Sequence, residues 1–138
     1  MHAYVPPQHP SAQFSTVHNW LNALCRRDFD AFGKLITDDY KHSVLPGSKG
    51  PVASNKEEGI AFAEKAMKPF KSVEFEIYAV NEAPGSIWIH LMLHAVSNDD
   101  KPFSSEYIHL FTLEEGPSPK ICVMDEFVDT KKLADLFE

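Results

Sequence analysis

The second half of the chain alternates between apolar and polar residues in successive runs, and this pattern restricts the fold more than any other feature. The runs cover residues 72–80, 86–96, 103–113 and 120–128, with stretches rich in Pro, Gly, Asn and Asp between them. A period of two is typical of β-strands, and short connections of this composition favour turns between sequential strands. We therefore expect an antiparallel meander.

The first half of the chain has mainly helical patterns. Apolar residues recur every three or four positions over residues 11–25, and residues 28–37 and 54–70 repeat this spacing. Asp28 is expected to cap the second helix, and Ser54 with Glu57 forms a capping-box pattern before the third. Residues 40–47 alternate like a strand.

The last residues, 130–138, predict a helix that docks the apolar side chains Leu133, Leu136 and Phe137. Asp129 is expected to cap this helix. With helices early and strands late, the order of elements predicts an α+β fold in which a curved antiparallel sheet wraps over helices. We expect one domain over residues 11–138, preceded by an extended arm over residues 1–10.

Composition restricts the partners. Thirteen Lys and Arg against twenty Asp and Glu give a net charge of −7, which repels nucleic acid. No apolar run approaches the roughly 18–20 residues of a membrane span, and residues 1–10 lack a signal-peptide pattern. Cys25 and Cys122 form no CxxC pair and are expected to be reduced core residues of a cytoplasmic protein. Motifs for nucleotide cofactors are absent from the sequence, so we expect no cofactor.

Three short motifs are similar to those of mostly uncharacterised fungal proteins. Tyr40–Pro46 (YKHSVLP) is similar to Y-T-H-x-x-L-P, Ser105–Tyr107 (SEY) to N-E-Y, and Asp125–Thr130 (DEFVDT) to K-E-F-V-D-S. Their order and spacing, over roughly residues 14–137, resemble the SnoaL-like branch of the nuclear transport factor 2-like superfamily. This resemblance implies a cone-shaped sheet around a deep apolar pocket, the chemistry of small cyclases, isomerases and dehydratases, and a homodimer.

A comparison with ketosteroid isomerases of the same fold implies which residues face the pocket. The catalytic aspartate, the oxyanion-hole tyrosine and the protonated aspartate of those enzymes fall near Val44, Trp20 and His109, so their apparatus is not retained. Trp20 is expected to form an aromatic floor. The remaining strand residues that the comparison turns inward are Tyr40, His42, Val44, Tyr107, His109, Met124, Glu126 and Val128.

Glu126 is the first catalytic candidate, because it alternates with the apolar residues Met124 and Val128 on one strand face. Burial raises the pKa of a carboxyl group toward the range that suits general acid–base catalysis. Alternatively, Glu126 pairs with a nearby cation or lies at the solvated rim of the pocket.

His42 and Tyr40 share a strand face, as do His109 and Tyr107. An imidazole both donates and accepts protons near neutral pH, and the phenols could orient a substrate oxygen. The alternative is that these side chains fill the core while their polar atoms find backbone partners.

Other polar residues have secondary interpretations. Trp88 and His90 are expected to line the pocket, and Glu106 would replace Glu126 as the carboxylate if the strand were displaced by one residue. His90 and His94 lie four residues apart on a strand, about 13 Å, which is too far for one metal ion. A site formed by His42, His90 and His109 from three strands stays open, but no motif indicates it, so we expect no metal site.

Two functions remain open. One is a cofactor-independent isomerase, cyclase or dehydratase that binds an apolar oxygenated metabolite, with Glu126 and His42 as acid and base. The other is a non-catalytic module that binds a small ligand or a partner. The aliphatic residues at alternate positions from Ile87 to Ala95 form either the core or a dimer interface.

Overall fold

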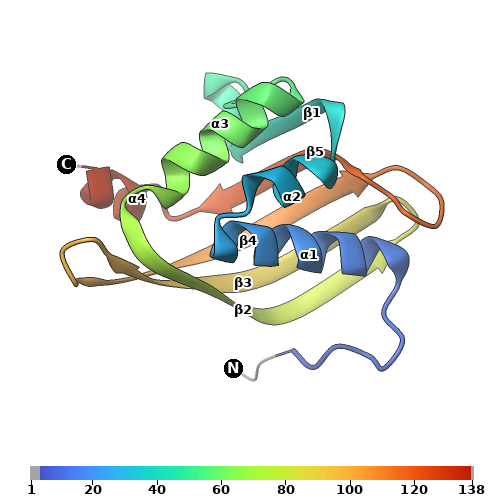
Figure 1. Ribbon diagram of the computed structural model, residues 1–138, viewed down its shortest axis with the longest axis horizontal. Helices are drawn as coiled ribbons and strands as arrows, with labels where there is room; N and C mark the ends of the chain where they lie inside the picture. The colour runs from blue at the N-terminus through green and yellow to red at the C-terminus, as the bar shows by residue number, and fades with distance from the viewer. Residues whose placement is uncertain (1–3, 138) are drawn as a thin grey trace.

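The computed structural model describes residues 4–137, and its elements follow the predicted order (Figure 1). The helices are α1 (Ala12–Arg26), α2 (Phe29–Lys34), α3 (Lys56–Met67) and α4 (Thr130–Phe137), with a 3-10 turn η1 (Gly47–Lys49) before α3. The strands are β1 (Ile36–Leu45), β2 (Phe70–Ala83), β3 (Ser86–Ser97), β4 (Pro102–Leu113) and β5 (Ile121–Val128). The predicted α+β class is confirmed.

The strands form one curved sheet in the order β1-β5-β4-β3-β2. Strands β2 to β5 make the predicted antiparallel meander, but β1 pairs in parallel with β5, so the sheet is mixed. The crossover through α3 separates β1 from β2 and lets the chain return to the opposite edge of the sheet. The first and last strands are therefore neighbours.

Figure 1 shows α1, α2 and α3 grouped on the inner side of the curved sheet. The core lies between these helices and the sheet, and it includes Trp20 from α1 and Phe32 from α2. On β3, the residues at alternate positions from Ile87 to Ala95 are all buried in this core. This aliphatic face is thus part of the core of one chain.

Polar side chains determine where several helices begin. Asp28 caps α2 as predicted, because its carboxylate accepts a hydrogen bond from the Ala31 N–H. The capping box at Ser54 is wrong by one residue: Asn55, in extended conformation, accepts from the Glu58 N–H at 2.8 Å.

At the end of the chain, Asp129 accepts the Lys131 and Lys132 N–H groups, as expected of the cap of α4. The expected docking of Leu133, Leu136 and Phe137 concerns side chains outside the described part of the structure. Near the start, the Tyr4 N–H donates to the Ile77 carbonyl of β2. Within residues 4–137, no helix is long and apolar enough to cross a membrane.

Candidate active site

The pairing of three neighbouring strands brings two imidazoles to one carboxylate. Glu126 lies on β5, between β4 and β1, and is paired with His109 on β4 and with Val44 on β1. His42 lies two residues before Val44, and alternate residues of a strand point to the same face. His42, Glu126 and His109 therefore converge on the inner face of the sheet.

The three side chains are in contact and nearly excluded from solvent. Nε2 of His42 lies 3.2 Å from Oε1 of Glu126, and Nε2 of His109 lies 3.4 Å from Oε2 of Glu126. The exposed fractions of the three residues are 6, 9 and 3% for His42, Glu126 and His109. Each carboxylate oxygen thus faces its own imidazole at ion-pair distance.

The electrostatics of Glu126 correct the sequence-based expectation. Burial alone raises the pKa of its carboxyl group, as predicted, but the two imidazoles outweigh burial and lower the pKa to about 2. Hydrogen bonding to the imidazoles, and their charge whenever they are protonated, stabilises the ionised form. Glu126 is therefore a carboxylate at neutral pH and cannot itself supply a proton there. The alternative of a paired carboxylate describes it better.

A cavity of about 400 Å³ opens beside this cluster and is lined mainly by apolar side chains. Its volume is in the range of sites for small organic ligands. The sequence-predicted residues that line it are Trp20, His42, Val44, Tyr107, His109, Met124, Glu126 and Val128.

The two tyrosines differ in position. Tyr107 lines the cavity, whereas Tyr40 is fully buried beside it and packs edge-to-face against Phe32. Burial, and secondarily the charge of Glu126, raises the pKa of both phenols far above the ordinary value. Both therefore remain neutral, and Tyr107 is the phenol that could contact a ligand.

Several buried polar atoms around the cavity lack a hydrogen-bond partner among the described residues. They include Nε1 of Trp20 and Nδ1 of His109, both from residues that line the cavity. An unsatisfied buried polar atom costs about 1–3 kcal/mol.

Three predicted binding residues lie on the wrong face of the sheet. Trp88, His90 and Glu106 project to the outer face, because the residues that alternate with them, such as Ile89 and Tyr107, point inward. His90 pairs there with Glu106, and Trp88 is 53% exposed. None of the three residues lines the inner cavity.

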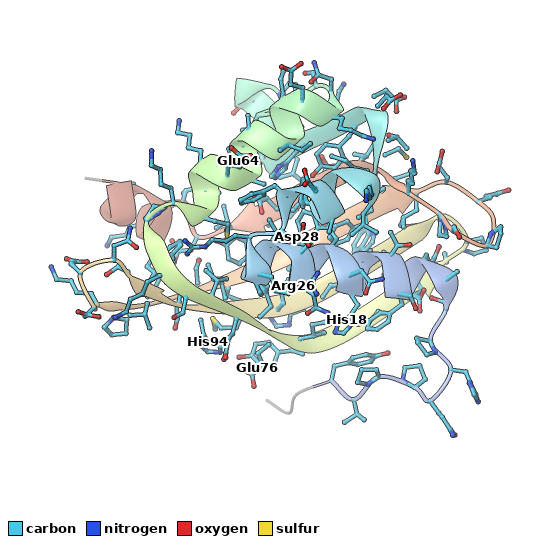
Figure 2. All side chains as sticks on the ribbon, viewed as in Figure 1. His18, Arg26, Asp28, Glu64, Glu76 and His94 are labelled. Carbon is cyan, nitrogen blue, oxygen red and sulfur yellow. The ribbon has the colours of Figure 1, made fainter. Side chains whose placement is uncertain are left out.

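Figure 2 shows the same orientation for two labelled neighbours, His94 on β3 and Glu76 on β2, which project from the sheet away from the helices. They also form an imidazole–carboxylate pair, at 3.1 Å. Among residues 4–137, no group of three or more His, Cys, Asp or Glu side chains is arranged to hold a metal ion. Cys25 and Cys122 are free thiols.

Sequence reasoning missed the contribution of α3. Phe62 lies edge-on to the imidazole of His42, with ring centroids 4.9 Å apart, and Lys65 lines the cavity one helical turn later. Both belong to a stripe, spaced by three residues, beside the buried stripe that was recognised. The spacing was visible, but only the sheet determines that this stripe faces a cavity.

Comparisons with known proteins agree with this architecture. The family model of the SnoaL-like domain matches residues 17–123, most of the chain. The chain belongs to the SnoaL-like family. This family is part of the nuclear transport factor 2-like superfamily, as the sequence motifs implied. A search of curated protein sequences found no significant match.

Solved structures of this SnoaL-like protein's fold include proteins with different names. A SnoaL-like polyketide cyclase, so named, from Jannaschia sp. CCS1 is 16% identical, with a TM-score of 0.76 over 94% of this chain and 96% of the other. PrhC from Penicillium brasilianum is 19% identical, with a TM-score of 0.75 over 91% and 85%. An LEH-like epoxide hydrolase of M. tuberculosis is 14% identical, with a TM-score of 0.72 over 91% and 88%. At these identities the likeness establishes the fold alone.

Proposed function

We propose that this SnoaL-like protein is a cofactor-independent enzyme that isomerises, cyclises or dehydrates an apolar, oxygenated small molecule. The observation that carries the proposal is the ionised Glu126 between the imidazoles of His42 and His109, on the wall of an apolar cavity. Neighbours of the same fold that are named cyclase or epoxide hydrolase are consistent with such chemistry.

In the proposed mechanism, Glu126 orients and the imidazoles transfer protons. A carboxylate beside Nε2 favours a proton on that nitrogen, which leaves Nδ1 of the same ring as the acceptor. Nδ1 of His109 is buried and has no partner among the described residues. It would take a proton from a substrate carbon or hydroxyl group, and Glu126 would stabilise the resulting imidazolium.

Return of the proton from His109 to another substrate atom would complete an isomerisation. Its transfer to a substrate hydroxyl group, which then leaves as water while a double bond forms, would complete a dehydration. Trp20 and Tyr107 line the cavity, and their indole N–H and phenol are neutral donors. They would hold the substrate oxygen on which negative charge develops. The apolar walls would exclude bulk water and strengthen these interactions.

Proton exchange tests the proposal without knowledge of the substrate. A panel of apolar enones, ketones and β-hydroxyketones is incubated with the protein in D₂O, and deuterium incorporation is followed by NMR. We expect catalysed exchange for at least one compound, and a loss of about 100-fold or more in the variant His109→Gln, as for removal of a general base.

The alternative function is a binding module, for which the apolar cavity alone would suffice. Two results together would favour this module. The wild type and the double variant His42→Gln/His109→Gln would show the same rate of deuterium exchange for every compound of the panel, and an apolar fluorescent probe would bind both proteins. The cluster of ionisable groups is the observation that makes the enzyme the better proposal, since a purely apolar ligand would gain nothing from it.

We also propose that the protein forms a homodimer through the outer face of the sheet. Trp88 on β3, Ile108 on β4 and Phe127 on β5 are 53, 42 and 47% exposed. Trp88 and Ile108 lie on neighbouring strands, and Ile108 is paired with Phe127. Exposed large apolar residues on adjoining strands are typical of protein interfaces.

A further inference from the structure

Lys65 has an unusual position for a charged side chain. It lies in the last turn of α3, is exposed to solvent, and nevertheless lines the cavity. Among the described residues of the cavity wall it is the only lysine or arginine, and Glu126 is the only acidic residue. Its exposure places it at the mouth, whereas Glu126 is buried at the wall.

The ammonium group of Lys65 is not engaged by an acidic side chain of the described residues, since their ion pairs involve other lysines and histidines. On the helix surface, its neighbours three and four positions away are Ala61, Phe62, Lys68 and Pro69. None of these carries a negative charge. A cation in the last turn of a helix interacts favourably with the helix dipole, but Lys68, the C-cap residue, already supplies a cation at this end of α3.

The inner end of the cavity does not need this cation. The negative charge of Glu126 is already stabilised by His42 and His109, so Lys65 has no electrostatic partner within the cavity wall. Phe62, on the same face of α3, contacts His42, and Lys65 follows about 4.5 Å further along the helix axis at 1.5 Å per residue. Most of the other side chains that line the cavity are apolar.

We propose that Lys65 recognises an anionic group at one end of the substrate. The substrate would then be an amphipathic acid: an apolar body of several carbon atoms, an oxygen function near His109, and a carboxylate or similar group at the mouth. This inference names the substrate class of the proposed enzyme and rests on that function for the role of the inner end. Recognition of the anion itself does not require catalysis.

Ligand pairs that differ only in charge test the proposal. Decanoate and 1-decanol have the same apolar chain. Each is titrated at pH 8 against N-phenyl-1-naphthylamine, an apolar fluorescent probe bound to the 138-residue chain. Variants are Lys65→Met, which keeps an apolar stem, Lys65→Glu, and the control Lys68→Met, which removes a charge from the same helix end outside the cavity wall.

We expect Lys65→Met to weaken the binding of decanoate roughly three- to fivefold, as for the loss of one exposed ion pair. Lys65→Glu should weaken this binding further. Binding of 1-decanol should change less than twofold in both variants, and Lys68→Met should resemble the wild type. A decyl phosphate that depends on Lys65 more strongly than decanoate would support recognition of a phosphate rather than a carboxylate.

Any of three results would overturn the proposal. The first is that Lys65→Met weakens the binding of decanoate and of 1-decanol equally, and the second is that Lys65→Met and Lys68→Met weaken the binding of decanoate equally. The third is that decanoate does not bind at millimolar concentration. The proposed enzyme fails by a separate measurement, the exchange of deuterium. A protein that selects anions through Lys65 but catalyses no exchange would be an acid-binding module, so the two failures are distinguishable.

Discussion

Gly59 allows α3 to approach β1 closely, and its replacement by alanine tests the packing beneath the site. A β-carbon added at Gly59 would lie 2.7 Å from both Cδ1 and Cε1 of Tyr40 and 3.5 Å from Cδ1 of Ile36. Real β-carbons essentially never come this near to another atom. The ring of Tyr40 is fully buried and packs against Phe32, so it has little room to move.

The expected cost of Gly59→Ala is the difference of two terms. Overpacking of a filled core typically costs about 1–3 kcal/mol, while replacing glycine in a helix by alanine regains about 0.8–1 kcal/mol. Because the added β-carbon would meet a rigid, fully buried ring, we take the upper part of the overpacking range, about 2–3 kcal/mol. The expected net loss is then about 1–2 kcal/mol in the free energy of unfolding. For a chain of 138 residues, this lowers the melting temperature by about 3–7 °C, because the unfolding entropy is about 2.1 cal/mol/K per residue.

Thermal and urea unfolding, followed by circular dichroism, measure this loss. Gly33→Ala in α2 is the matched control, since its β-carbon would meet only the flexible Cδ1 of Ile60, at 3.0 Å, and the helix propensity should balance the strain. In a double-mutant cycle, Tyr40→Leu should cost less in the Gly59→Ala background than alone. A Gly59→Ala variant as stable as the wild type would refute the close packing of α3 on Tyr40.

Two further predictions concern charge and association. The folded-state pKa of Glu126 lies near 2, against an ordinary value of 4.5. The ionised carboxylate therefore contributes its full stabilisation above about pH 4.5, and this stabilisation disappears as the pH falls toward 2. At about 1.4 kcal/mol per pKa unit, the contribution amounts to about 3 kcal/mol. Urea unfolding from pH 7 to pH 2.5 should therefore show a smaller acid loss for Glu126→Gln than for the wild type, and parallel curves would contradict the ion pair. On the outer face of the sheet, Trp88→Lys should convert the dimer to a monomer, as measured by light scattering. The melting temperature should change little, because Trp88 is half exposed in one chain. A wild-type protein that is monomeric at high micromolar concentration would rule out the dimer.

Local patterns predicted the elements because each pattern reports one physical constraint. The alternation in the second half of the chain, and the spacing of Phe14, Val17 and Leu21 in α1, follow from burying one face of a strand or helix. The cap of α3 was misplaced by one residue because Ser54 and Asn55 are adjacent and both suit the position. Sequence patterns locate helix ends, but competition between neighbouring caps is decided by backbone geometry.

The face of a strand was harder to predict than the strand itself. On β3, both faces carry large apolar side chains, Ile89 inward and Trp88 outward, so hydrophobicity alone could not identify the inner face. On β5, the register taken from the comparison with ketosteroid isomerases turned Glu126 inward, and Glu126 does line the cavity. The pocket-lining roles of Trp88 and His90 were wrong for this reason.

The sign of the Glu126 pKa shift could not be predicted from its own strand, because it depends on which strands lie on either side. The apolar neighbours Met124 and Val128 are visible in the sequence and favour a raised pKa. The imidazole of His42, which helps to lower it, comes from a strand more than 80 residues earlier, and the parallel pairing of β1 with β5 is what brings it near. Had β1 instead paired with β2, its neighbour along the sequence of strands, His42 would lie at the far edge of the sheet and Glu126 would face one imidazole. The crossover through α3 thus places both the second imidazole and Lys65 beside the cavity. The same connection that makes the sheet mixed therefore also helps to keep the buried carboxylate ionised.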